Sequence, residues 1–209
     1  MRGIDKALAP IGGVPMLLRT VRAVAKSEKI DEIIVVTRQD LLQCVTELCK
    51  NEPKFRTAVC GGSSRTESVQ NGLAATDAQM VAIHDGARPF VSVASIDRAI
   101  EAAEKFGAAA PAIPVKDTVK VAKNSEILHT PDRSTLYAVQ TPQVFYTQEI
   151  RSTLETAMQQ KLALTDDCSA MEAIGKRVIL TEGDDENIKI TTPIDLDFAE
   201  AIAKRRDAL

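Results

Sequence analysis

Along the chain, segments with apolar residues at helical spacing alternate with short continuous apolar runs. In residues 15–27, Leu17, Val21 and Val24 lie about one helical turn apart, and the run IDEIIVVT that follows is apolar enough for a buried strand. The same alternation returns in residues 57–76, in residues 81–107 and again after residue 145. Strands that alternate with amphipathic helices predict an α/β fold, with a mainly parallel sheet and helices on both of its faces.

Capping residues suggest where the predicted helices begin and end. Helix starts are predicted at Ser64, Ser95, Thr147, Thr165 and Thr192, with Pro193 as the first helical residue of the last helix. Glu67 has capping-box spacing from Ser64, and Gly72 and Gly107 are predicted helix ends. The pattern contains no opening strand, because residues 2–13 are a polar loop and the first strand candidate lies near residue 33. We therefore expect a further strand before this sequence.

Residues 108–145 interrupt this alternation. Short β-type runs and turn residues follow one another there, which predicts an extended hairpin or arm. The chain of 209 residues is otherwise long enough for one sizeable core, so we predict a single domain over residues 1–209.

Composition narrows the class of protein. Lys and Arg number 26 against 29 Asp and Glu, and 3% of residues are aromatic with no Trp, so nucleic acid is not an expected partner. Four cysteines without a CxxC pair and two histidines argue against a zinc site or a disulfide framework and fit a reducing compartment. No apolar run approaches the roughly 20 residues that span a bilayer, so we expect no membrane partner.

The stretch VAIHDGARPF, residues 81–90, holds the first candidate for chemistry. If Val81 to Ile83 close a parallel strand, Asp85 lies at the carboxyl edge of the sheet, where open α/β folds bind their ligands. A carboxylate there binds a divalent cation or a substrate hydroxyl. The alternative is a capped turn in which Arg88 is a surface partner of Asp85. His84 is interpreted as a structural histidine.

A second candidate is the stretch CGGSSRTESV, residues 60–69. Its glycine pair allows a tight turn ahead of a helix N-terminus, which suits a nucleotide phosphate, although an ordinary strand-to-helix turn has the same composition. Arg65 and Ser68 lie one helical turn apart on one face. Lys6 and Lys189 are loop cations suited to neutralising phosphate, and Arg133 either grips a phosphate or is a turn residue.

Seven stretches in this order resemble the 2-C-methyl-D-erythritol 4-phosphate cytidylyltransferases: KALAPIGGVPML, GGSSRTESV, HDGARPF, PVKDTVK, HTPDRSTLYAVQTPQVF, TDDCSAMEAIG and ENIKITTPIDL. The resemblance implies a Rossmann-like nucleotidyltransferase fold with a protruding β-arm at about residues 111–137 that makes a homodimer. It implies transfer of a cytidylyl group from CTP to methylerythritol phosphate with Mg²⁺, releasing pyrophosphate in isoprenoid precursor synthesis by the non-mevalonate pathway. The implied location is the cytoplasm, or a plastid if the source is a plant or alga.

The resemblance also assigns roles to individual positions. It makes Lys6 and Lys189 catalytic, and it places Asp85 beside the ribose and the metal. The cytidine-binding residues would be Gly62, Arg65 and Ser68, with Asp85 and Gly86 next to them. The residues around methylerythritol phosphate would be Thr118, Arg133, Thr141 and Thr165, with the arm contributed by the neighbouring subunit.

Two departures from the family pattern keep alternatives open. The family opens with a strand and a loop of the type AAGxGxR around the triphosphate, and nothing in this sequence matches that loop. Glu186 stands where the family tends to have Asp, which lengthens the carboxylate and bears on metal geometry. The alternatives are a cytidylyltransferase for another polyol phosphate, such as ribitol 5-phosphate, and a catalytically silent dimeric binding module.

Overall fold

A five-stranded sheet forms the centre of the computed structural model, which describes residues 6–208 and the side chains from Ala7 onward. Its strand order is β11-β6-β10-β5, and β9 pairs with β6. The strands are β5 (Met80–Ile83), β6 (Ala108–Pro114), β9 (Tyr137–Val139), β10 (Gln143–Tyr146) and β11 (Ile179–Glu182). β11 is parallel to β6, whereas β10 is antiparallel to both β6 and β5. The strands β5, β6 and β11 therefore share one direction, with β10 reversed between them.

Two further strands form a separate pair. β3 (Ile33–Thr37) is parallel to β4 (Phe55–Cys60) and, in the described part of the chain, pairs with no other strand. A cavity of about 410 Å³ lies between β3 and β5, with side chains of both strands and of two helices in its wall. Among residues 6–208 no strand lies between β3 and β5.

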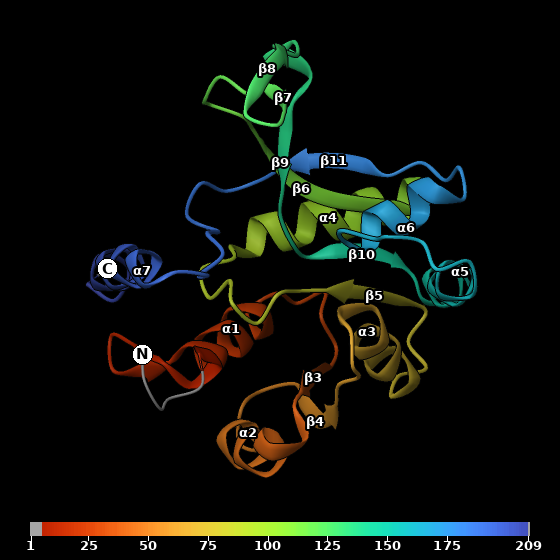
Figure 1. The fold of residues 1–209 in the computed structure, drawn as a ribbon. Coiled ribbons are helices and arrows are strands. Elements are labelled where there is room, and N and C mark those ends of the chain that lie inside the picture. Colours follow the sequence, from red (N-terminus) through yellow and green to blue (C-terminus); the bar gives the residue numbers. More distant parts are fainter. Residues whose placement is uncertain (1–5, 209) are drawn as a thin grey trace.

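Helices cover both faces of the central sheet, as the sequence pattern predicts (Figure 1). The helices of the described chain are α1 (Met16–Ala25), α2 (Leu42–Cys49), α3 (Arg65–Ala74), α4 (Val93–Phe106), α5 (Thr147–Gln159), α6 (Asp167–Ala173) and α7 (Pro193–Arg206), of which α2 packs on β3 and β4 and α7 on β1 instead of on the central sheet. On β6, Ala108 and Ala110 face a core built from α3, α5 and α6, while Ala109 faces α4. The alternation follows from the two-residue period of a strand. Small side chains on β6 let the helices pack closely on each face.

Several predicted helix ends are confirmed. The Ser64 hydroxyl accepts the Glu67 N–H at 3.1 Å, Thr192 caps α7, and Gly107 ends α4 with φ +98°. The prediction for Ser95 is wrong, because the Ser92 hydroxyl caps α4 three residues earlier.

The other helix-end predictions are also corrected. Gly72 lies inside α3, and Thr147 is the first residue of α5, where its hydroxyl donates to the Ala78 carbonyl instead of capping the helix. α6 begins after Asp166 and not after Thr165, because the Asp166 carboxylate accepts the Ser169 N–H.

The interruption in the pattern contains a small separate hairpin. Among the described residues, β7 (Val121–Lys123) pairs with β8 (Glu126–His129) alone, and Asn124 and Ser125 make the turn with φ of +51° and +66°. Figure 1 shows the hairpin at the far end of β9 from the helices. Ile127 and Leu128 on β8 are exposed. Shorter elements complete the description: η1 (Lys6–Leu8), β1 (Pro10–Ile11), β2 (Val14–Pro15), η2 (Gln39–Leu41) and η3 (Arg133–Thr135). No helix among the described residues is long and apolar enough to cross a membrane.

Candidate functional site

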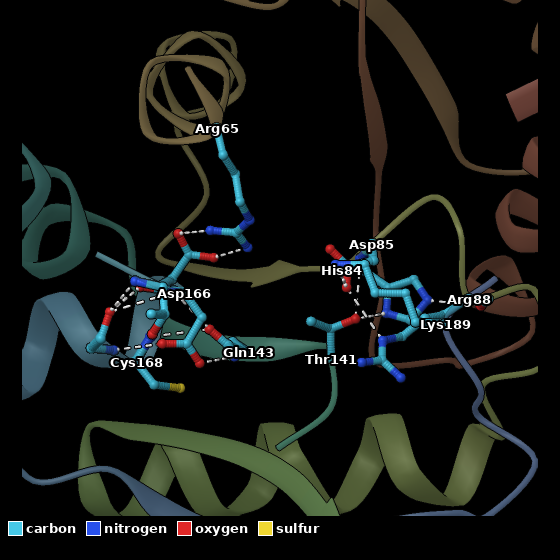
Figure 2. A network of polar contacts seen from close by, with 12 residues as sticks. Arg65, His84, Asp85, Arg88, Thr141, Gln143, Asp166, Cys168 and Lys189 are labelled. Atoms are coloured by element: carbon cyan, nitrogen blue, oxygen red, sulfur yellow. Dashed lines mark hydrogen bonds and ion pairs between the residues drawn. The ribbon is translucent and has the colours of Figure 1, made fainter. Parts of the chain in front are cut away.

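Asp85 and Lys189 meet where β5 ends, and Arg88 joins them (Figure 2). The Asp85 Oδ2 atom lies 3.1 Å from Lys189 Nζ and 3.3 Å from Arg88 Nε. Burial acts to raise the pKa of Asp85, but the charges and hydrogen bonds of Lys189 and Arg88 outweigh it and hold the pKa below its usual value. The site therefore presents an ionised carboxylate between two cations. Arg88 is largely buried, so interpreting it as a surface partner is wrong.

The segment that carries Lys189 is anchored by Asn187. The buried Asn187 amide donates to the Thr141 carbonyl at 2.9 Å, and the Asn187 carbonyl accepts from Arg88 Nη1 at 2.6 Å. The Ile190 N–H also donates to the Ala87 carbonyl at 2.9 Å. These bonds fix the backbone on both sides of Lys189, while its side chain remains 46% exposed and able to meet a ligand.

Thr141 and His84 form the floor beneath this cluster. Thr141 is 4% exposed, and its hydroxyl accepts the Asp85 N–H at 3.1 Å. The same oxygen lies 2.9 Å from His84 Nδ1, while His84 Nε2 lies 3.1 Å from the Arg88 carbonyl. Burial lowers the pKa of His84 to about 4, so the ring is neutral at neutral pH. These contacts agree with the interpretation of His84 as a structural histidine.

Arg65 is held by an acidic residue far along the chain. Its Nη1 and Nη2 atoms donate to Asp167 at 2.9 and 2.6 Å, and Asp167 is 1% exposed. Burial raises the pKa of Asp167, and the bonds from Arg65 work against that rise. Gln143 completes the connection by accepting the Asp167 and Cys168 N–H groups and donating to Asp166. α3 and α6 are thus joined through polar contacts at the start of β10, where Gln143 lies (Figure 2).

The glycine turn before α3 is closed by Ser68. The Ser68 hydroxyl accepts the Gly62 N–H at 3.0 Å and donates to the Ser64 carbonyl at 2.8 Å. A Cβ on Gly62 would lie 2.1 Å from Glu67 Cγ, so a larger residue there would displace Glu67. Four of the predicted nucleotide-binding residues line the cavity between β3 and β5: Arg65, Ser68, Asp85 and Gly86. The Gly86 carbonyl accepts from the Thr20 hydroxyl at 2.9 Å.

In the described part of the chain, Thr118, Arg133 and Thr165 make no hydrogen bond or ion pair with Asp85. Arg133 lies in η3, where its Nη1 donates to the Lys116 carbonyl at 2.9 Å, and Thr118 is exposed between β6 and β7. Thr165 precedes the cap of α6, and its N–H donates to Ser169 Oγ at 3.1 Å. Lys6 opens η1, and its side chain lies outside the described residues. Within one protomer, the structure does not bring Thr118 and Arg133 into contact with the cluster around Asp85.

The side chains near Asp85 determine whether the site suits a metal ion. No group of three His, Cys, Asp or Glu side chains suited to a metal occurs among the described residues. Mg²⁺ is commonly held by one or two carboxylates together with substrate phosphates and water, so a single Asp85 fits such a shared site. Glu186 does not join it, because its carboxylate pairs with Arg205 and Arg206 of α7.

From the sequence alone, no site role was assigned to three residues of this region. Arg88 could have been identified from its i,i+3 spacing to Asp85, and Asn187 belongs to a stretch that was singled out only for its lysine. The local sequence carried no signal that Asp167 would partner Arg65, because the two residues lie on separate helices.

Comparisons with known proteins agree on one family. Residues 1–205 match the family model of 2-C-methyl-D-erythritol 4-phosphate cytidylyltransferase. The enzyme of that name from Geobacillus kaustophilus is 42% identical over 209 residues, covering 99% of this chain and 92% of that protein. The one from Caldanaerobacter subterraneus is 43% identical over 216 residues, covering 98% and 92%. The crystal structure of 4-diphosphocytidyl-2C-methyl-D-erythritol synthase from Anaerococcus prevotii superposes with a TM-score of 0.89 at 33% identity, covering 96% and 92%.

Proposed function

The chain belongs to the 2-C-methyl-D-erythritol 4-phosphate cytidylyltransferase family, and from this premise we propose how its residues divide the work of the reaction. The family reaction joins CTP and methylerythritol phosphate in the non-mevalonate pathway of isoprenoid synthesis. A phosphate oxygen of methylerythritol phosphate attacks the α-phosphorus of CTP, the new P–O bond forms, and the bond to pyrophosphate breaks. No covalent enzyme intermediate is required, so positioning and charge neutralisation dominate.

Lys189 is proposed to neutralise phosphate charge at the reacting centre. The supporting observation is that its ammonium group lies 3.1 Å from Asp85 at the carboxyl end of β5, on a segment fixed by Asn187 and Ile190. Two anions must approach one another, and a preorganised cation reduces their repulsion and then stabilises the transition state. Lys6 is proposed as a second cation on the basis of the family pattern alone.

Asp85 is proposed as the protein ligand of Mg²⁺, together with phosphate oxygens of CTP. When bound, Mg²⁺ would supply further neutralisation of the phosphate charge. The chain's own contribution is a carboxylate kept ionised by Lys189 and Arg88. Lys189 is exposed enough to turn from Asp85 toward a phosphate, whereas Arg88 stays with Asp85 because its guanidinium is also bound to the Asn187 carbonyl.

The turn before α3 is proposed to bind the cytidine half of CTP. Gly62, Arg65, Ser68 and Gly86 are the residues involved, and all except Gly62 share the wall of one cavity with Asp85. Arg65 would act mainly by fixing α3 to α6 through Asp167, because both of its terminal nitrogens are already bonded there.

The β-arm is proposed to make a homodimer and to carry substrate-binding residues across to the neighbouring subunit. Exposed apolar side chains on the hairpin, among them Ile127 and Leu128, would be buried in such an interface. Arg133 and Thr118 are remote from Asp85 within a protomer, and pairing of two protomers would supply them to the partner's site. Thr141 and Thr165 would contribute from the same protomer. A cytoplasmic location is proposed from the bacterial relatives.

The test is pyrophosphate release from CTP and Mg²⁺ by the 209-residue chain, with methylerythritol phosphate and ribitol 5-phosphate offered separately. We expect release with methylerythritol phosphate alone. Release with ribitol 5-phosphate alone would overturn the polyol assignment. Release with neither substrate, in a sample shown to be folded by circular dichroism, would overturn the proposed division of roles for this chain.

A further inference from the structure

His84 is half-buried, whereas the other histidine, His129, is exposed, and both ring nitrogens of His84 are bonded. Nε2 lies 3.1 Å from the Arg88 carbonyl oxygen. A carbonyl oxygen can only accept a hydrogen bond, so Nε2 must carry a hydrogen. The other nitrogen, Nδ1, lies 2.9 Å from the Thr141 hydroxyl. A hydroxyl can donate or accept, so the state of Nδ1 depends on what else binds Thr141.

The Thr141 hydroxyl settles the state of Nδ1. Its oxygen already accepts the Asp85 N–H at 3.1 Å, and in the described part of the chain its only other partner is His84. If Nδ1 also carried a hydrogen, the hydroxyl would accept twice and its own proton would be left unpaired in a residue that is 4% exposed. A buried donor without a partner is destabilising. The hydroxyl therefore donates to a bare Nδ1, and the ring is neutral.

This assignment gives the loop after β5 a continuous hydrogen-bond chain. The Asp85 N–H donates to Thr141, Thr141 donates to His84, and His84 donates to the Arg88 carbonyl. The Arg88 N–H in turn donates to the Asp85 carbonyl at 3.0 Å. The loop from Asp85 to Arg88 is thereby held at both ends by one imidazole and one hydroxyl.

We propose that His84 is a positioning residue for cytidylyl transfer, which as its Nε2–H tautomer holds Thr141 and the loop Asp85–Arg88 so that Asp85 faces Lys189. This inference rests on the proposed function of Asp85 and Lys189. Thr141 then acts on the site through the backbone of Asp85, and the second acceptor position of its hydroxyl remains for a substrate hydroxyl. Arg88 is placed by the same chain, through its carbonyl.

The first test is the tautomer of His84, measured by long-range ¹H–¹⁵N correlation on histidine-labelled protein near pH 7.5. The chain has two histidines, and His129 on β8 is exposed, so it serves as an internal control for an unrestrained ring. We expect His84 as a single tautomer with hydrogen on Nε2. Hydrogen on Nδ1, or the tautomer mixture of an exposed ring, would overturn the proposal. This measurement needs neither a variant nor an active enzyme.

The second test compares His84→Phe, Thr141→Val and the double variant by kinetics. Each single change should lower kcat by about a hundredfold, since small displacements of reacting groups have effects of that size, while KM for CTP changes by less than about threefold. Because both residues act through one chain, the double variant should be no slower than the slower single variant. Losses that multiply, or an unchanged kcat in folded His84→Phe, would overturn the proposal. An inactive wild type would instead contradict the proposed function, and the tautomer would then decide the assignment.

Discussion

Replacing Lys189 with Ala should remove activity while leaving the fold almost unchanged. Lys189 is 46% exposed, its one ion pair within residues 6–208 is with Asp85, and exposed pairs contribute about 0–1 kcal/mol to stability. Asp85 does not lose its only partner, because Arg88 Nε remains 3.3 Å from the same carboxylate oxygen. We therefore expect the free energy of unfolding to fall by less than about 1 kcal/mol.

The effect on turnover should be much larger. Removing one preorganised group that stabilises transition-state charge typically costs about 3 kcal/mol, which corresponds to a loss of about a hundredfold in kcat. The assay is pyrophosphate release with saturating CTP and methylerythritol phosphate, paired with urea denaturation of the same samples. Lys176→Ala is the matched control, since Lys176 is a similarly exposed lysine paired with Glu149 at 2.7 Å and has no proposed role in the site.

Two results would refute this reasoning. If Lys189→Ala retained kcat close to that of Lys176→Ala, the cation would not act on the reacting phosphates. If Lys189→Ala lost about 3 kcal/mol of stability, the pair with Asp85 would be behaving as a buried ion pair and not as an exposed one.

Three further predictions concern the ion pair, the histidine and the arm. Arg65→Met leaves the 1% exposed Asp167 unpaired and should lower the free energy of unfolding by about 3 kcal/mol. Asp167→Asn should cost less, because the Arg65 left behind is 41% exposed and can be hydrated. Equal losses for the two variants in urea denaturation would contradict this. Burial lowers the pKa of His84 from 6.5 to about 4, so on acidification the unfolded chain takes up this proton before the folded protein does. The free energy of unfolding should therefore fall by about 3 kcal/mol in total as the pH drops from about 6.5 to 4. His84→Gln should flatten this pH dependence, whereas its loss in His129→Gln would refute the assignment. If the proposed homodimer forms through the arm, the double variant Ile127→Asp, Leu128→Asp should be monomeric in light scattering with little change in protomer stability, because both residues are exposed on β8. A dimer that persists in this variant would exclude the arm from the interface.

Local sequence predicted most of the helices and the placement of several site residues. The 3.6-residue period and caps such as Ser64 and Thr192 indicate helices because they depend only on neighbours within one or two turns. Caps were misplaced where two hydroxyl or carboxylate candidates lay close together, as at Ser92 and Ser95. Asp85 was singled out from its place just after a predicted strand, which is also a local feature.

Periodicity and capping did not predict the contacts between segments that are distant in the sequence. The sequence pattern alone gave no sign that β10 runs against its neighbours, since strand direction depends on which segments pair. Nor did it indicate that Arg65 binds Asp167, or that Asn187 brings Lys189 to Asp85. These partners lie on separate elements and share no local spacing.

The sequence by itself therefore determined the alternation of strands and helices, the residue types available for phosphate chemistry, and the family to which the chain belongs. Tertiary structure decided which of those residues act together. Lys189 faces Asp85, Arg65 is already held by Asp167, and Thr141 is bonded to His84 and to the Asp85 backbone. The physical reason is that periodicity and capping depend on bonds within a few residues, whereas burial, charge pairing and the tautomer of a histidine depend on groups that only folding brings within about 3 Å of one another.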